Sequence, residues 1–179
     1  LKYRISIAGS DKADIISKID AFLDDTVLTG VVVDEVDTPP QKLAFVFTGQ
    51  GPQWYAMGQE LIASEPLFKS VIQEIEAYFK EIAGWSLLEE MNKDEENTRV
   101  HDTRIAQPAI MAIQIALVEL WKKHGVTPQG VVGHSIGEVA AAYTSGALTL
   151  EQAVQVIFHR SRGQHAATGK GKIDLTCTR

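Results

Sequence analysis

The spacing of apolar and polar residues changes several times along the chain. The first part with a recognisable pattern is short and covers residues 1–40. Tyr3–Ala8 alternates apolar and polar side chains, as a half-buried strand does. Ser10-Asp11 can cap a helix that runs to about Leu23, whose apolar face carries Ile15, Ile16, Ile19, Phe22 and Leu23. Val31–Val33 is a second strand-like run, and Asp37–Pro40 favours a linker. We therefore predict a small α/β segment over residues 1–40.

A longer series of elements follows from residue 41 onwards. The apolar run Leu43–Phe47 predicts a buried strand. Helical periodicity predicts a helix over Pro66–Ile82, with its proline in the first turn, and a strongly apolar helix over Ala106–His124 that ends near Gly125. Between these helices, the charged run Lys93–Glu96 predicts a solvated loop.

A third apolar run, Gly130–Gly133, leads directly into the motif G-x-S-x-G, and a helix-forming run to Tyr143 follows. This order is typical of a nucleophile elbow, in which a strand turns sharply into a helix and a serine, here Ser135, stands at the apex. Glycines at 133 and 137 would leave room for the tight turn. The helix would aim its N-terminal N–H groups at a developing oxyanion. The alternative is a glycine-rich connection with an unreactive serine.

A last helix is predicted from Leu150 to about His165. Strands that alternate with helices are typical of the α/β class, so we expect a parallel sheet with flanking helices. A chain of 179 residues that is 45% hydrophobic and 22% charged can bury one sizeable core and carry a small appendage.

Charge and composition narrow the function classes. A net charge of −6 without a Lys/Arg cluster argues against nucleic-acid binding. The run Ile110–Leu120 is interrupted by Gln114 and Glu119, which argues against a membrane span. The single cysteine, Cys177, forms no internal disulfide and favours a reducing, cytoplasmic compartment. Five histidines and one cysteine show no metal-ligand spacing, so no metal is expected.

The loop after Leu43–Phe47 carries a second candidate for acyl chemistry. Gly49 and Gly51 bracket Gln50, which lets the backbone approach a ligand or expose its N–H groups. Taken together with the elbow, this loop would supply the second amide donor that acyl transfer needs.

Three motifs in order carry a resemblance to a known family. F-V-F-x-G-Q-G-x-Q-W-x-x-M-G from Phe45, Gln-Pro-Ala from Gln107 and G-H-S-I-G-E from Gly133 are similar to the acyltransferase domains of polyketide and fatty acid synthases. The match covers roughly residues 42–172. It implies that residues 1–40 end a small α/β linker and that residues 41–172 form the N-terminal part of an α/β-hydrolase-like large subdomain, without the family's small ferredoxin-like subdomain.

The resemblance also implies a reaction. Ser135 would attack the thioester of a malonyl-type coenzyme A, and the acyl group would pass to the phosphopantetheine thiol of an acyl carrier protein, with no bound cofactor. The N–H groups of Gln50 and Ile136 would hold the oxyanion. Gln107 would line the pocket, although a plain polar residue near a helix start is an equal alternative. The neighbours would be other domains of a multidomain synthase, with a ketosynthase next to the linker.

We assign Arg160, through its positive charge, to the recognition of the substrate. It follows Ser135 by 25 residues and lies three residues after Ile157, at the edge of the apolar stripe of its helix. In the family that the chain resembles, an arginine at this spacing binds the free carboxylate of malonyl-type substrates; the alternative is a surface arginine. Arg162 is expected to reach solvent. The choice between malonyl and methylmalonyl stays open.

No histidine in the chain is well placed by the sequence as a base. His134 adjoins Ser135, but neighbours on an extended segment point to opposite sides, so it cannot easily serve as the base of the serine. We expect it to pack or bond beneath the elbow and group it with the substrate-binding residues Arg160 and Gln107. We predict that His101, His124 and His159 lie at the surface, and His165 is the only one to test as a base. The resemblance places the catalytic histidine downstream, beyond residue 179.

The C-terminal residues depart from the family pattern. Lys170–Lys172 resembles the start of a glycine-rich turn, but residues 173–179 are polar and diverge from the strand that normally follows. We therefore expect an incomplete domain that is a poor transferase alone and exposes the apolar faces of the helices Ala106–His124 and Leu150–His165. Two other functions stay open, a serine esterase of the α/β-hydrolase type, which would not need Arg160, and a non-catalytic scaffold fragment.

Overall fold

The computed structural model describes residues 2–26, 28–35 and 42–169, and the chain divides into two compact units, residues 1–41 and 42–179. The predicted linker Asp37–Pro40, the turn Lys170–Lys172, the tail 173–179 and Cys177 lie outside the described residues.

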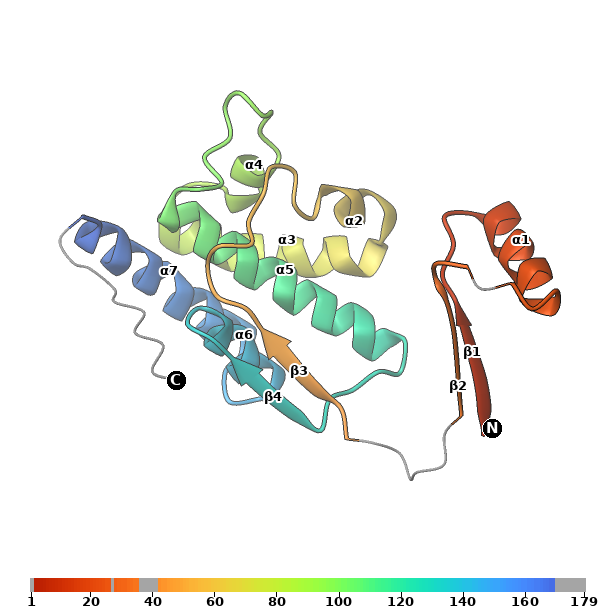
Figure 1. The fold of residues 1–179 in the computed structure, drawn as a ribbon. Helices are drawn as coiled ribbons and strands as arrows, with labels where there is room; N and C mark the ends of the chain where they lie inside the picture. Colours follow the sequence, from red (N-terminus) through yellow and green to blue (C-terminus); the bar gives the residue numbers. More distant parts are fainter. Residues whose placement is uncertain (1, 27, 36–41, 170–179) are drawn as a thin grey trace. The chain divides into compact units, whose positions relative to one another are not determined.

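The first unit is a strand–helix–strand arrangement. Strand β1 (Tyr3–Ile7) pairs antiparallel with β2 (Val31–Glu35), and helix α1 (Lys12–Leu23) connects them (Figure 1). Of the predicted pair Ser10-Asp11, Asp11 is the cap of α1, and its carboxylate accepts the Asp14 N–H. Lys18 Nζ donates to the Ala8 carbonyl oxygen and to the Asp14 carboxylate, both at 2.8 Å, which fastens α1 to the end of β1.

The second unit holds the core. Its strands β3 (Ala44–Phe47) and β4 (Gly130–Gly133) are parallel, with Ala44 opposite Gly130 and Phe47 opposite Gly133. Its helices are α2 (Gln59–Ser64), α3 (Pro66–Ala83), α4 (Leu87–Met91), α5 (Thr103–Lys123), α6 (Gly137–Thr144) and α7 (Leu150–Ala167). Helix α5 packs against α3 and α7, and α6 packs against both strands (Figure 1). The predicted α/β class with a parallel sheet and flanking helices is confirmed.

Most predicted helices and strands lie within one or two residues of their expected bounds. The exception is α5, which begins at Thr103 because the Asp102 carboxylate caps it by accepting the Arg104 N–H at 2.9 Å, so Pro108 lies inside the helix rather than at its start. The short helices α2 and α4 were not predicted. Ser86, which caps α4 by accepting the Glu89 N–H, was the available signal for the second.

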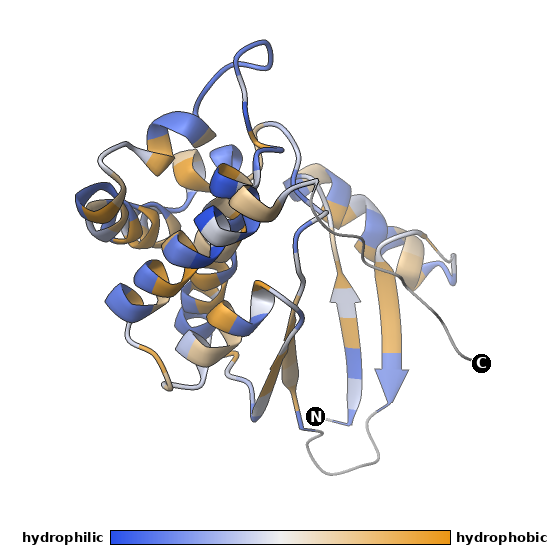
Figure 2. Ribbon diagram, turned by 90° about the vertical axis from the view of Figure 1, so that its left-hand side faces the viewer, coloured by the Kyte–Doolittle hydropathy of each residue, from blue (hydrophilic) through white to orange (hydrophobic). Residues whose placement is uncertain are grey.

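The core lies between the helices, where their apolar stripes meet (Figure 2). Phe68, Ile75 and Phe79 of α3 and Met111 and Ile115 of α5 are fully buried. Val154 and Ile157 bring α7 into the same core. By length and composition alone α5 could cross a membrane, but most of it is buried as the central helix of this unit.

The expected exposure of helix faces is borne out only in part. Most apolar residues of α5 and α7 are buried within the unit, because α3, α5, α6 and α7 cover one another, but Trp121 of α5 and Val156 of α7 are 53% and 42% exposed. Apolar surface also stays open on the sheet, where Val46 and Val132 lie opposite each other and are 72% and 54% exposed.

Candidate active site

The backbone at Ser135 is held in a conformation that few non-glycine residues adopt. Its φ is +57°, in the left-handed region, between the end of β4 and the start of α6. A residue in this region carries roughly 1–3 kcal/mol of strain and persists only where its surroundings impose the conformation. Here the His134 N–H donates to the Phe47 carbonyl oxygen at 2.9 Å, which holds the turn against the end of β3. The geometry is that of a nucleophile elbow with Ser135 at its apex.

The two motif glycines are required by close backbone contacts. A Cβ atom on Gly133 would lie 2.4 Å from the Glu138 nitrogen, and one on Gly137 would lie 2.3 Å from the Phe47 carbonyl oxygen. Gly49, in the loop after β3, is also crowded, since an added Cβ would lie 3.2 Å from the Ser135 Cβ. The Gln50 loop and the elbow are therefore in direct contact, although their residues are far apart in the sequence.

Arg160 reaches the serine from α7. Its Nη2 donates to Ser135 Oγ at 2.9 Å, and its Nη1 donates to Gln107 Oε1 at 2.8 Å and to Gln164 Oε1 at 3.1 Å. The sequence leaves two interpretations of Gln107 open, a pocket-lining residue and an ordinary polar residue at a helix start. Gln107 is 1% exposed, which does not fit the second interpretation. The guanidinium is a fixed positive charge beside the serine hydroxyl.

Gln50 joins the same network. Gln107 Nε2 donates to Gln50 Oε1 at 3.1 Å, and Gln50 Nε2 donates to Thr103 Oγ1 at 3.4 Å. Within the described residues, the backbone N–H groups of Gln50 and Ile136 donate to no protein acceptor. Both candidate oxyanion donors therefore lie on the two segments that meet at Ser135 and are not engaged elsewhere in the described chain.

The expectation for His134 was wrong in one respect. Its side chain is exposed rather than packed beneath the elbow, and it makes no hydrogen bond to the described residues. Its ring lies beside the loop after β3, since a Cβ added to Gly49 would be 2.9 Å from His134 Nδ1, and its backbone N–H donates to the Phe47 carbonyl oxygen. A role in substrate binding stays a prediction.

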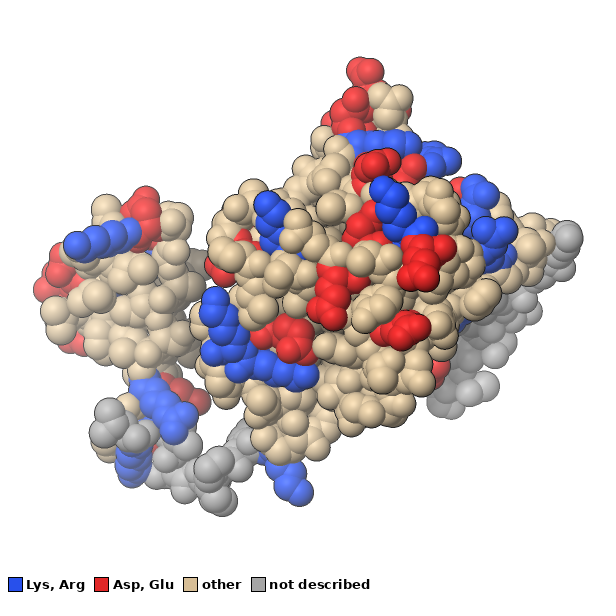
Figure 3. Space-filling model, turned by 180° about the vertical axis from the view of Figure 1, so that it is seen from behind, with Lys and Arg blue, Asp and Glu red and all other residues tan. Residues whose placement is uncertain are grey.

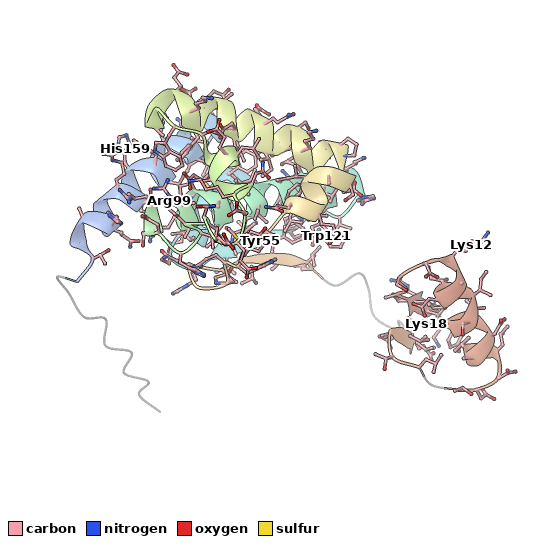
Figure 4. The ribbon with its side chains drawn as sticks, turned by 90° about the horizontal axis from the view of Figure 1, so that it is seen from above. Lys12, Lys18, Tyr55, Arg99, Trp121 and His159 are labelled. Carbon is pink, nitrogen blue, oxygen red and sulfur yellow. The ribbon has the colours of Figure 1, made fainter. Side chains whose placement is uncertain are left out.

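The remaining histidines lie away from the serine. His101, His124 and His159 are exposed, as predicted, and Figure 4 shows His159 on the outer side of α7. His165 is half-buried, with its Nδ1 3.5 Å from Asp102 Oδ1. Among the described residues, Arg160 is the one whose side chain bonds to Ser135 Oγ, so none of these histidines is in place as its base.

Asp102 is a strongly acidic group at the start of α5. The hydrogen bond from the Arg104 guanidinium, with help from the Arg104 N–H and His165, lowers its pKa to about 2 despite partial burial. Asp102, which caps the helix that carries Gln107, thus lies beside His165 of α7.

A cavity of about 230 Å³ lies elsewhere on α7, lined by Trp85, Arg99, Arg104, Ile105, Phe158, Ser161 and Arg162. Ser135 and Arg160 are not in its lining. Two of its arginines are already paired, Arg99 with Glu90 and Arg104 with Asp102. Burial opposes ionisation of Glu90, but the bonds from Arg99 and Lys93 outweigh it and hold the Glu90 pKa below its usual value. Arg162, expected in solvent, is exposed and lies over the Phe158 ring.

Two residues of the network were not predicted. Gln164 lies four residues after Arg160, on the same face of α7, and this i,i+4 spacing was a usable signal. Thr103 had no such signal, because its bond to Gln50 spans 53 residues. Among the described residues, no group of three His, Cys, Asp or Glu side chains is arranged so that it could hold a metal ion.

Known proteins resemble this chain in sequence and in fold. Residues 44–176 match the family described as acyl transferase domain. A highly reducing polyketide synthase of Aspergillus terreus is 49% identical over 128 residues, which is 71% of this chain and 5% of the relative. The chain thus spans about a twentieth of the length of that curated relative.

Two solved structures agree with this result. The acyltransferase domain from the second module of the salinomycin polyketide synthase has a TM-score of 0.81 and 33% identity, and the match covers 93% of this chain and 39% of that one. The malonyl-CoA:ACP transacylase of Synechocystis sp. PCC 6803 has a TM-score of 0.61 and 32% identity, with 72% and 42% covered.

Proposed function

Because the chain belongs to the acyl transferase domain family, we propose that it takes part in moving a malonyl-type acyl group from coenzyme A to the phosphopantetheine thiol of an acyl carrier protein, through an acyl-enzyme on Ser135. The observation that carries the proposal is the bond of 2.9 Å from Arg160 Nη2 to Ser135 Oγ. It puts a nucleophile at a strained elbow beside a cation that suits a carboxylate.

The first half-reaction forms the acyl-enzyme. Ser135 Oγ attacks the thioester carbonyl carbon, the hydroxyl proton passes to a base, and the carbonyl oxygen becomes an oxyanion. The N–H groups of Gln50 and Ile136 are assigned to this oxyanion, and loss of one such donor lowers the rate about 10²–10³-fold. Collapse of the intermediate breaks the C–S bond, and the base returns the proton to the sulfur of the departing coenzyme A. In the second half-reaction the base takes the proton of the carrier thiol, the thiolate attacks the serine ester, and the C–O bond breaks as Ser135 Oγ regains a proton.

Arg160 is assigned to the free carboxylate of the acyl group. When a malonyl group is bound, the guanidinium would pair with that carboxylate, and Gln107 would line the same pocket. A serine esterase of the α/β-hydrolase type would use the same elbow, but a half-buried arginine bonded to the serine has no role with a neutral ester. The contact therefore favours transfer of an acid-bearing acyl group over hydrolysis.

The wider setting is also a proposal. The relatives are polyketide synthases, so we assign the chain to the acyltransferase region of a cytoplasmic multidomain synthase, with residues 1–40 as the linker towards a ketosynthase. The same chemistry would serve fatty acid biosynthesis.

Intact-mass analysis tests the proposal directly. The full chain and a chimera, in which residues 44–169 replace the equivalent part of the salinomycin acyltransferase domain, are each incubated with malonyl-CoA. We expect a malonyl adduct on Ser135 of the chimera, none in its Ser135→Ala variant, and little or none on the chain alone, whose described residues offer Ser135 no base. An adduct that maps to Ser145 or Ser161, or no adduct on the chimera, would refute the proposal and leave the scaffold alternative.

A further inference from the structure

The Nη1 group of Arg160 has both of its hydrogens engaged. A guanidinium Nη carries two N–H donors. In this structure, one of the Nη1 donors meets Gln107 Oε1 at 2.8 Å and the other meets Gln164 Oε1 at 3.1 Å. One side of the guanidinium is therefore saturated by two amide oxygens, one from α5 and one from α7.

The orientation of both amides is determined by the charge. Arg160 has no acceptor, so only an amide oxygen can face it. Gln107 then turns its Nε2 outward, where it donates to Gln50 Oε1 and also to Gln164 Oε1. Gln164 Oε1 thus accepts hydrogen bonds from both Arg160 and Gln107. Arg160 Nη1, Gln107 and Gln164 are therefore each bonded to the other two.

The position of Gln164 separates this contact from the core. Gln164 is exposed on α7, whereas Gln107 is 1% exposed. A substitution of Gln164 removes a bond to Arg160 without opening a cavity, because no core packing depends on its side chain. Gln164 can therefore be tested with little effect on folding, which Gln107 does not allow.

From this juxtaposition we infer that Gln164 is a positioning residue for substrate recognition, an inference that rests on the proposed function. Gln164 and Gln107 together fix the position of Arg160 Nη1, and this keeps Nη2 of the same guanidinium directed at Ser135. The remaining N–H groups, on Nη2 and Nε, then receive the substrate carboxylate; Nε bonds to no acceptor among the described residues. The carboxylate is bound along the Nη2–Nε edge and not at the Nη1–Nη2 end, which the two glutamines block.

The test compares malonyl-CoA with acetyl-CoA as substrates of the chimera defined above, because the described residues of the chain alone offer Ser135 no base. We expect Gln164→Leu to lower kcat/KM for malonyl-CoA about three- to tenfold, mainly through KM, since one bond to a charged group is lost. Transfer of acetyl, which has no carboxylate, should change less than twofold. Gln164→Glu should lower malonyl transfer further, because its carboxylate would occupy Arg160 in place of the substrate.

Gln155→Leu is the matched control. Gln155 is another exposed glutamine of α7, and it bonds only to Glu151 on the same helix, so its replacement should leave both substrates unchanged. Equal changes for malonyl and acetyl in Gln164→Leu, or no change for either, would overturn the inference. A wild-type chimera that is not acylated on Ser135 would instead refute the proposed function.

Discussion

Ser135 depends on two neighbours that have no side chain. Gly133 and Gly137 allow strand β4, helix α6 and the end of β3 to approach within contact distance, and this approach imposes the left-handed backbone of the serine. The strain at the serine is thus supported by packing at the glycines. A side chain at Gly137 would push the end of β3, and with it the loop that carries Gln50, away from the elbow.

Gly137→Ala should therefore destabilise the second unit. Its Cβ would lie 2.3 Å from the Phe47 carbonyl oxygen, and overpacking of this kind lowers the free energy of unfolding by about 1–3 kcal/mol or more. Urea unfolding followed by tryptophan fluorescence reports on this unit, since Trp54, Trp85 and Trp121 all lie in it.

Gly163→Ala is the matched control for that change. Gly163 lies inside α7, and an added Cβ would meet nothing within 4 Å, so alanine should stabilise the helix by about 0.5–1 kcal/mol. A Gly137→Ala variant as stable as Gly163→Ala would contradict the packing that we describe at the elbow.

Arg160→Ala should separate acid-bearing from neutral substrates. In the chimera, malonyl transfer should fall about ten- to a hundredfold, because a bond to a charged group contributes about 1.5–3 kcal/mol. Acetyl transfer should be kept or should rise. The measurement is kcat/KM for both coenzyme A esters, with Arg162→Ala as the control, since Arg162 is exposed and does not bond to Ser135. Equal losses for both substrates would give Arg160 a structural role.

At the scale of elements, the site is built by α5 and α7, and each helix has a defined start. Thr149 and Gln152 form a reciprocal capping box at the start of α7, which carries Arg160 and Gln164. Asp102 caps α5, which carries Gln107. Because the two helices pack together in the core, their side chains converge on one guanidinium.

The charge of Asp102 should make the stability of the second unit depend on pH. Its pKa lies at about 2 in the folded chain, below the ordinary value of 3.8, so its stabilising effect is present above about pH 4 and is lost as the pH falls towards 2. Asp102→Asn keeps a good capping residue but removes the charge. At pH 7 we expect this variant to be less stable than the wild type by about 1–2 kcal/mol, since Arg104 is partly exposed.

Urea titrations between pH 7 and pH 2.5 measure this difference, which should shrink as Asp102 of the wild type becomes protonated. Asp94→Asn is the control, because Asp94 also accepts a backbone N–H, from Asn97, but forms no ion pair among the described residues. A difference that stays constant with pH would show that capping, not charge, is what Asp102 contributes.

At the scale of the whole molecule, acidic and basic side chains are mixed on the surface, whereas several exposed apolar side chains gather on one face of the β3–β4 sheet. Figure 3 shows acidic and basic side chains interspersed over one face. The open face of the β3–β4 sheet, in contrast, presents Val46 and Val132, and Trp121 is 53% exposed and lines a groove together with Val46. Apolar patches of this kind favour association.

The double variant Val46→Thr and Val132→Thr should reduce self-association of the chain. Threonine keeps the strand preference of valine, and exposed substitutions change the free energy of unfolding by only about 0.5 kcal/mol. Sedimentation velocity across a concentration series measures the effect. Val154→Thr, at a fully buried position, is the control and should instead destabilise by about 1–3 kcal/mol. If self-association is unchanged in the double variant, the surface through which the chain associates is not the Val46–Val132 face of the sheet.

The sequence by itself determined the longer elements and the elbow. Hydrophobic periodicity, the helix-start signals at Ser10-Asp11 and Pro66, and the glycines around Ser135 act over a few residues, so each local pattern is readable without the fold. The motif order was also sufficient to identify the family. The start of α5 was placed too late because a capping aspartate outweighed the pattern around Pro108.

Only the tertiary structure decided how the site is assembled. Gln50 and Gln107 are 57 residues apart, as are Gln107 and Gln164, and no local pattern encodes which amide faces which. The exposure of His134, the burial of Gln107 and the open face at Val46 likewise depend on which distant segments cover them. Local backbone preference sets where a strand turns into a helix, whereas the contacts of a side chain are set by the packing of α5, α7 and the sheet against one another.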